Sequence, residues 1–271
     1  MIVCLYVDDF VITGILAMVI IFKTQLLRKF NAKDLGEAKY VLGIEIIQSQ
    51  NNISITQASY ITNVINSLGL SSANSTQVPA SGGDVKKASL AQDEPMTSST
   101  PYREIVGKLM YAMVGTRPDI TFAVGWLGQF SFNPTELNLQ TAKKTVHYLI
   151  GTNKAKISYL QAGKSLKLKI FVDSDWGGGE DRKSTTGYIA LINGAPVSWQ
   201  SKRQPTVALS STEAEYMAAT QAAKEAIWLR RLLSDLGHNQ NSPTVILKDN
   251  NGCIELAKNP IHHAHTKHID I

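Results

Sequence analysis

The feature that most constrains the fold of this chain is the apolar pattern of the segment that follows Gly151. Short apolar stretches typical of β-strands come before a long segment whose apolar residues recur every three or four positions, as on one face of a helix. Strands are predicted at 165–172, 187–192, 197–200 and 244–247, and helices at 212–236 and 252–257. The order β-β-β-α-β-α predicts a mixed β-sheet with flanking helices, an α/β layout.

The first seventy residues predict a smaller α+β piece. The first twelve residues read as two apolar strands around a tight turn at Val7, Asp8 and Asp9, because Asp is favoured where strands reverse. A helix is expected at 15–30, strands at 40–47 and 53–55, and a helix at 60–68 that Gly69 ends. The two carboxylates are therefore expected at a hairpin tip.

The middle of the chain divides into a polar stretch and a helical one. Residues 71–101 are rich in Ser, Thr, Asn, Pro, Gly and Ala, so we expect a linker that does not order itself firmly. Apolar residues at helical spacing predict helices at 102–114, 119–130 and 137–149. The predicted domain boundaries are 1–70, 71–101, 102–152 and 157–271.

Composition excludes several classes of protein. A hydrophobic fraction of 44% and a charged fraction of 18% are typical of globular domains and not of disordered or coiled-coil chains. Cys4 and Cys253 lie too far apart for a zinc knuckle or a disulfide framework, which favours a reducing compartment. The apolar stretch 15–22 is too short to span a bilayer and lacks a basic flank, so we expect no membrane anchor and no secretion signal.

Positive charge is concentrated in one segment. Residues 101–170 carry ten basic and three acidic side chains, whereas the chain as a whole has a net charge of +5. Such a segment fits a surface that binds a polyanion backbone, and a solvated lysine-rich face is the alternative. The lysines proposed to contact nucleic acid are Lys143, Lys144, Lys154 and Lys156.

Isolated carboxylates fall where strands end and helices begin in the last hundred residues. They are Asp173 and Asp175 after one strand, Glu213 and Glu215 at the start of the long helix, Asp249 after the last strand, and Asp270. Acids held together repel one another unless divalent cations neutralise them, and pairs of Mg²⁺ ions serve in phosphodiester cleavage. Taken singly, Asp173 could equally close a turn, and Asp249 could equally cap the helix that follows it.

Periodicity distinguishes the two glutamates. Glu215 lies in line with Ala218, Ala222 and Leu229 on the apolar stripe of the predicted helix, so it is expected to face inward. Glu213 follows Ser210 in the S-x-x-E pattern of a capping box, which gives it a structural role. The four histidines His262, His263, His265 and His268 could bind zinc, but they have no thiolate partners, and a zinc site is disfavoured.

Several motifs resemble those of copia-type retrotransposon Pol polyproteins. The string YVDD at 6–9 resembles the hairpin of reverse transcriptases, and KDLGE at 33–37 with YVLGIE at 40–45 resembles the passage from palm to thumb. TRPDI at 116–120 is similar to the connection region of that family. Motifs similar to its ribonuclease H domain are FVDSDW at 171–176, RKST at 182–185, STEAEY at 211–216, DN at 249–250 and TKHID at 266–270.

The resemblance implies a fold and a chemistry. It implies a truncated palm and thumb at 1–70, a linker, a basic helical connection at 102–152, and a ribonuclease H-like domain at 157–271 that is cut short at its end. Asp173, Glu215, Asp249 and Asp270 would be its catalytic, metal-binding acids. They would hold two Mg²⁺ ions, or Mn²⁺ instead of Mg²⁺, and the substrate would be an RNA:DNA hybrid. Asp8 and Asp9 would belong to a polymerase site that lacks its third acid and its nucleotide-binding fingers, so no polymerase activity is expected.

Two functional interpretations therefore remain open at this point. One is an intracellular ribonuclease H that works in a cytoplasmic particle or the nucleus, alongside the rest of a Pol polyprotein. The other is a catalytically inactive transposon remnant that only binds nucleic acid. Intact acids favour the enzyme, and the truncations favour the remnant.

Overall fold

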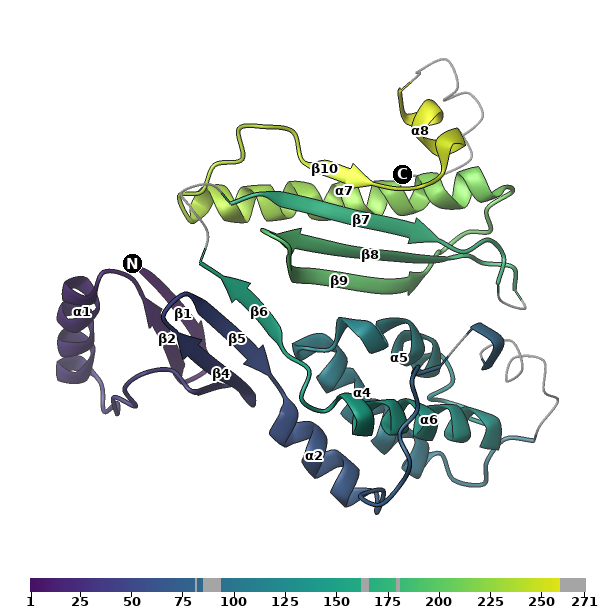
Figure 1. Ribbon diagram of the computed structural model, residues 1–271, viewed down its shortest axis with the longest axis horizontal. Coiled ribbons are helices and arrows are strands. Elements are labelled where there is room, and N and C mark those ends of the chain that lie inside the picture. Colours follow the sequence, from purple (N-terminus) through teal and green to yellow (C-terminus); the bar gives the residue numbers. More distant parts are fainter. Residues whose placement is uncertain (81, 85–93, 162–165, 179–180, 259–271) are drawn as a thin grey trace.

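The computed structural model describes a mixed α+β protein with three β-sheets and a group of packed helices (Figure 1). The described residues are 1–80, 82–84, 94–161, 166–178 and 181–258. The mixed α and β content predicted from the sequence is confirmed. Within this described part, no helix is both long and apolar enough to cross a membrane.

The chain begins with a two-stranded antiparallel hairpin followed by a helix, as predicted. The elements are β1 (Ile2–Tyr6), β2 (Asp9–Thr13) and α1 (Leu16–Lys29). Val7, in the turn, has a φ of 54°, a left-handed value that is unusual for a β-branched residue. Helix α1 has no buried residue, and apolar side chains such as Leu5, Ile15 and Leu16 are exposed. This piece therefore adds nothing to the buried cores described below.

A second sheet joins segments that lie a hundred residues apart. Its order is β3-β4-β5-β6, all antiparallel, and Ile55 of β5 lies opposite Ile157 of β6. The strands are β3 (Tyr40–Val41), β4 (Ile44–Ser49), β5 (Asn52–Thr56) and β6 (Ile157–Leu160). The single strand predicted at 40–47 is wrong, because Leu42 and Gly43 both have positive φ and turn the chain into a hairpin.

The helical core is inserted in sequence between β5 and β6 of the second sheet. It consists of α2 (Ala58–Ser67), α4 (Thr100–Gly115), the 3₁₀ turn η1 (Pro118–Ile120), α5 (Thr121–Gly128) and α6 (Glu136–Thr152). Tyr102, Leu109, Val124 and Val146 are among the fully buried side chains at its centre. The helices predicted from apolar spacing are confirmed, and Thr135 caps α6 reciprocally with Asn138.

The described parts of the polar stretch 71–101 dock onto this helical core. The Thr76 amide donates to the His147 carbonyl at 3.3 Å, and the Met96 amide donates to the Pro134 carbonyl at 2.9 Å. Lys144 forms an ion pair with Asp84 across 2.7 Å. Composition alone predicted a linker without firm order at 71–101. In its described parts, backbone hydrogen bonds to α6 and to the turn before α6 hold the chain in place.

The C-terminal sheet has the order β10-β7-β8-β9 (Figure 1). Its elements and the helices associated with it are β7 (Leu168–Ser174), β8 (Thr185–Ile192), β9 (Ala195–Arg203), α7 (Ser211–Asp235), β10 (Val245–Leu247) and α8 (Asn251–Lys258). β10 runs parallel to β7, and the other pairs are antiparallel. Alternate residues of β7 pack against the apolar stripe of α7. The element order β7, β8, β9, α7, β10, α8 confirms the predicted β-β-β-α-β-α order.

Arg117 ties the start of η1 to the end of α6. Its guanidinium, 1% exposed, donates to Asp119 at 2.6 Å and to the Thr152 carbonyl at 3.1 Å, and it stacks over the ring of Tyr148. The Tyr148 hydroxyl donates to the same Asp119 carboxylate at 2.8 Å. Burial acts to raise the pKa of Asp119, but the hydrogen bonds and charge of Arg117 outweigh it and hold that pKa below its usual value.

We expect Asp119→Asn to lower the free energy of unfolding by about 2 kcal/mol at pH 7, because it leaves a buried guanidinium without its counter-charge. The loss should be smaller than for a fully buried pair, since solvent reaches Asp119. A carboxylate with a lowered pKa stabilises the fold above its unfolded pKa of about 3.9, so the difference from wild type should vanish as the pH falls through the lowered value.

Urea unfolding at several pH values measures this difference. Asp235→Asn, at the exposed end of α7, is the matched control and should change the free energy of unfolding by less than about 0.5 kcal/mol. An Asp119→Asn variant as stable as wild type at pH 7 would show that the ion pair contributes nothing.

Candidate carboxylate site

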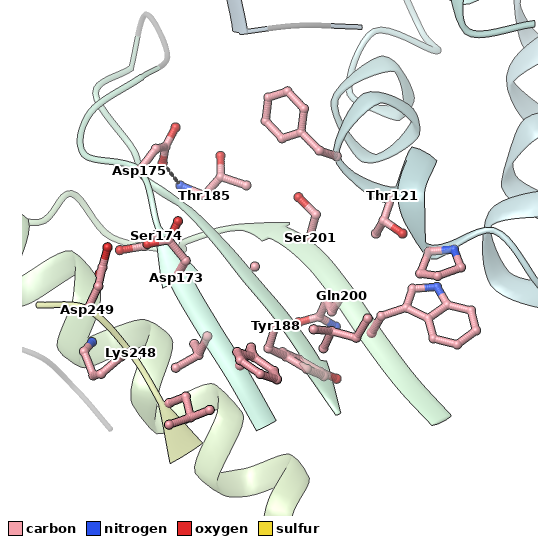
Figure 2. A pocket seen from close by; sticks show the side chains of 18 residues that line it. Thr121, Asp173, Ser174, Asp175, Thr185, Tyr188, Gln200, Ser201, Lys248 and Asp249 are labelled. Atoms are coloured by element: carbon pink, nitrogen blue, oxygen red, sulfur yellow. Dashed lines mark hydrogen bonds between the residues drawn. The ribbon is translucent and has the colours of Figure 1, made fainter. Parts of the chain in front are cut away.

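Three of the predicted acids meet at one edge of the C-terminal sheet. Asp173 lies near the end of β7, Asp249 follows β10, and Glu215 lies in the first turns of α7. Each offers one carboxylate oxygen, and these three oxygens lie within 4.8 Å of one another. Because β10 and β7 are parallel, their carboxyl ends reach the same edge, which brings Asp173 and Asp249 together (Figure 2).

The inward orientation predicted for Glu215 is confirmed. Glu215 is 5% exposed and shares a face of α7 with the buried residues Ala218, Ala222 and Leu229. Glu213 takes the capping role instead: the Ser210 hydroxyl accepts from the Glu213 amide at 3.2 Å, and the Glu213 carboxylate accepts from the Leu209 amide at 2.7 Å. The two glutamates are thus separated into a buried acid and a helix cap.

The structural roles considered for Asp173 and Asp249, closing a turn and capping a helix, are carried out by neighbouring residues instead. Asn250 caps α8, since its side-chain oxygen accepts from the Cys253 amide at 2.8 Å, and this leaves the exposed Asp249 carboxylate for other contacts. Asp175 closes the turn after β7 by accepting from the Thr185 amide, while Asp173 faces Glu215. Burial of the Asp175 carboxyl raises its pKa above the usual value.

Lys248 is a member of the cluster that was not predicted from the sequence. Its ammonium donates to the Glu215 carboxylate at 2.8 Å and to the Glu215 carbonyl at 3.0 Å, and both side chains are 7% exposed. The signal was present in the strand alternation: Lys248 lies two residues after Ile246, which packs on the α7 side of the sheet. A buried lysine just after β10, on the same side as Ile246, needs an acid nearby, and Glu215 is that acid.

The electrostatics of Glu215 reflect these neighbours. Burial is the largest influence and raises the pKa of Glu215 above its usual value. The Lys248 ammonium acts in the opposite direction, and the Asp173 carboxylate adds to the increase. The net effect is a raised pKa for Glu215, so the ionised form is disfavoured at this position, and a nearby cation stabilises it.

The two exposed acids, Asp173 and Asp249, border a cavity of about 810 Å³ between the C-terminal sheet and the start of α5 (Figure 2). Its lining includes Asp173 and Asp249 at one end and Thr121 and Phe122 of α5 at the other. The side-chain oxygens of Ser174, Gln200 and Thr121 are buried in this lining without a hydrogen-bond partner among the described residues. The carboxylates are therefore reached from an open, partly polar space.

The remaining predicted metal-binding residues lie elsewhere. Asp8 and Asp9 are exposed at the β1–β2 hairpin, and Asp173, Glu215 and Asp249 form the only group of three or more acids, histidines or cysteines found together in the described part of the chain. Asp270 and the four clustered histidines of residues 262–268 lie outside the described residues. The structure therefore brings three of the four predicted ribonuclease H acids together and leaves Asp270 unplaced.

The predicted nucleic-acid-binding lysines lie on and just after α6. Lys143, Lys154 and Lys156 are exposed, whereas Lys144 is half-buried and paired with Asp84. Three of the four ammonium groups are thus on the surface, and the fourth has a structural partner. Their contact with nucleic acid stays a prediction.

Comparisons with known proteins give the family. Residues 1–82 match the family described as reverse transcriptase (RNA-dependent DNA polymerase). The chain is 38% identical over its full length to the retrovirus-related Pol polyprotein from transposon TNT 1-94 of Nicotiana tabacum, and 39% identical over 98% of its length to that from transposon RE1 of Arabidopsis thaliana. A putative transposon Ty5-1 protein of Saccharomyces cerevisiae is 31% identical, with 82% of this chain matching 73% of that protein.

The N-terminal part is therefore reverse transcriptase sequence, and the protein is of the retrotransposon Pol class. The chain belongs to the family of copia-type retrotransposon Pol polyproteins, as its motifs predicted. It spans 21% and 18% of the length of the two plant polyproteins.

Proposed function

We propose that the C-terminal sheet and α7 form a ribonuclease H-like domain that hydrolyses the RNA strand of RNA:DNA hybrids with Mg²⁺. The observation that carries this proposal is the convergence of Asp173, Glu215 and Asp249, from three separate elements, within 4.8 Å at one sheet edge. The position of each acid matches a motif that resembles the ribonuclease H domain of the family. Asp270 is proposed as the fourth acid.

The donor set fits a hard divalent cation. Three carboxylates and no thiolate or imidazole make up the described cluster, and oxygen ligands are those that Mg²⁺ and Mn²⁺ prefer. Asp173 and Asp249 are exposed and can take up an ion from solvent, while buried Glu215 is fixed by α7. Two such ions, when bound, supply activation of water and stabilisation of the leaving 3′ oxygen.

The chain's own residues would position the substrate as well as the ions. The cavity beside the acids gives the phosphodiester a route to them, and the lysines on and after α6 would hold the nucleic acid backbone. The substrate is a hybrid by analogy with the family. The rest of a Pol polyprotein is the proposed partner.

The N-terminal part is proposed to be the palm and thumb of a reverse transcriptase, with an incomplete polymerase site. Asp8 and Asp9 would be its metal-binding pair at the β1–β2 hairpin. Within the described residues, no third acid joins them. This part is therefore not assigned an activity of its own.

A second candidate is a protein that binds nucleic acid without cleaving it. The observation that favours it is the Lys248 ammonium, which already pairs with Glu215 inside the cluster. A cluster neutralised by lysine alone would not activate water. Cleavage assays separate the two candidates.

We expect Asp173→Asn, Glu215→Gln and Asp249→Asn each to reduce cleavage of an RNA:DNA hybrid in Mg²⁺ by at least about 100-fold. Each change removes a charge that holds a divalent cation while nearly preserving side-chain volume. The measurement is release of labelled RNA fragments by the purified chain, with hybrid binding followed separately.

Glu213→Gln is the matched control for the acid substitutions. It should keep most of the cleavage activity and lose about 1 kcal/mol of stability, because Glu213 serves the start of α7. Full activity in Glu215→Gln together with loss in Glu213→Gln would show that the assignment of the two glutamates is reversed. Activity unaffected by all four changes would remove the proposed site.

Replacing Lys143, Lys154 and Lys156 together by Ala should weaken duplex binding at low salt and reduce the slope of log K against log salt by about 2 to 3, through loss of counterion release. Lys144 is left intact because it holds Asp84. The control replaces three exposed lysines outside this segment, Lys29, Lys33 and Lys224, with the same change of net charge. Equal slopes in the two triple variants would assign the first set to a merely solvated face.

A further inference from the structure

The carboxylate cluster already contains a cation of the protein's own. The Lys248 ammonium lies 2.8 Å from one carboxylate oxygen of Glu215 and 3.0 Å from the Glu215 carbonyl oxygen. Both side chains of the pair are 7% exposed, so solvent screens the interaction only weakly. The two contacts to one residue hold the ammonium at the buried side of the cluster.

The charge balance of the site follows from this placement. Asp173, Glu215 and Asp249 bring three negative charges when ionised, and Lys248 offsets one of them. Glu215 is the acid that most needs a counter-charge, because it is the buried member of the three. Lys248 therefore offsets part of the repulsion among the three carboxylates.

We propose that Lys248 is a tethered counter-ion that competes with the divalent cation for Glu215 and so sets the ion concentration that the site needs. The proposal rests on the proposed metal-dependent function and deepens it. It makes Lys248 a positioning residue: it touches Glu215 and acts on the ion through that carboxylate.

Competition follows from the geometry. An ion ligated by Glu215 would lie within a few ångströms of an ammonium that is held by the same residue, and a divalent ion repels a unit charge twice as strongly as another unit charge does. One oxygen of Glu215 is engaged by Lys248, and the other accepts weakly from the Ser174 amide at 3.4 Å. A divalent ion that binds Glu215 must therefore displace the Lys248 ammonium, or it binds more weakly because the ammonium repels it.

A purely supportive role for Lys248 predicts the opposite result. If its main effect were to hold Glu215 in a ligating position, removing it would loosen the carboxylate and weaken ion binding. If it competes, removing it strengthens ion binding. The direction of the change in affinity therefore decides between the two roles.

The test is a titration of the whole 271-residue chain with Mg²⁺ by calorimetry, and with Mn²⁺ by electron paramagnetic resonance, without nucleic acid. Lys248→Met, which keeps the length of the side chain, should bind either ion at least about tenfold more tightly than wild type. Lys248→Arg, which keeps the charge, should stay within about twofold of wild type. Lys169→Met, at an exposed position of β7 four residues before Asp173, should also stay within that range.

Thermal unfolding gives a second readout, with Lys248→Gln as the companion variant should Lys248→Met fold poorly. Without divalent ions both variants should melt below wild type, because the buried Glu215 carboxylate loses its counter-charge, and Mg²⁺ should raise their melting temperature more than that of wild type. Unchanged or weaker ion affinity in folded Lys248→Met and Lys248→Gln would overturn the proposal. Absence of ion binding in every protein would instead overturn the metal-dependent function itself.

Discussion

The parallel pairing of β10 with β7 is the constraint on which the candidate site depends. These two strands are far apart in the sequence, and their pairing sets Val245 opposite Lys169 and Leu247 opposite Phe171. The register carries the two following carboxylates, Asp173 and Asp249, to the same edge of the sheet. An antiparallel pair would have sent them to opposite edges, and no shared site could form.

Helix α7 completes the site because its apolar stripe must cover the sheet. Packing of Ala218, Ala222 and Leu229 against β7 fixes the rotation of the helix, and that rotation turns Glu215 toward the two aspartates. The small alanines allow the helix to approach the sheet closely. The buried acid is thus placed by core packing, and its charge is then balanced by Lys248.

Local patterns explain what could be predicted from the sequence. The long helix, the strand order around it and the inward face of Glu215 follow from apolar periodicity, which depends on a few neighbouring residues. The pairing of β6 with β5 could not be predicted, since it joins residues a hundred positions apart and depends on which edge is free. The turn at Leu42 was missed because a leucine with positive φ gives no signal of its own.

The ion-pair partners of charged side chains also could not be predicted from the sequence. Lys144 looked like one more free cation of a basic segment, but the tertiary fold brings Asp84 to it from a stretch that composition marked as a linker. Lys248 carried a signal in its spacing from Ile246, yet identifying its partner required knowing that α7 packs against β10. Such contacts between distant segments decide whether a charge binds a ligand or the protein itself.

The central claim is that Asp173, Glu215 and Asp249 form one cation site. A crystal structure of the chain grown with Mn²⁺, with anomalous scattering recorded from the ion, tests it most directly. The account predicts an anomalous peak in contact with oxygens of all three carboxylates, at the manganese–oxygen distances of a ligated ion. A peak at other residues, with the three carboxylates bound only to Lys248 and water, would contradict it.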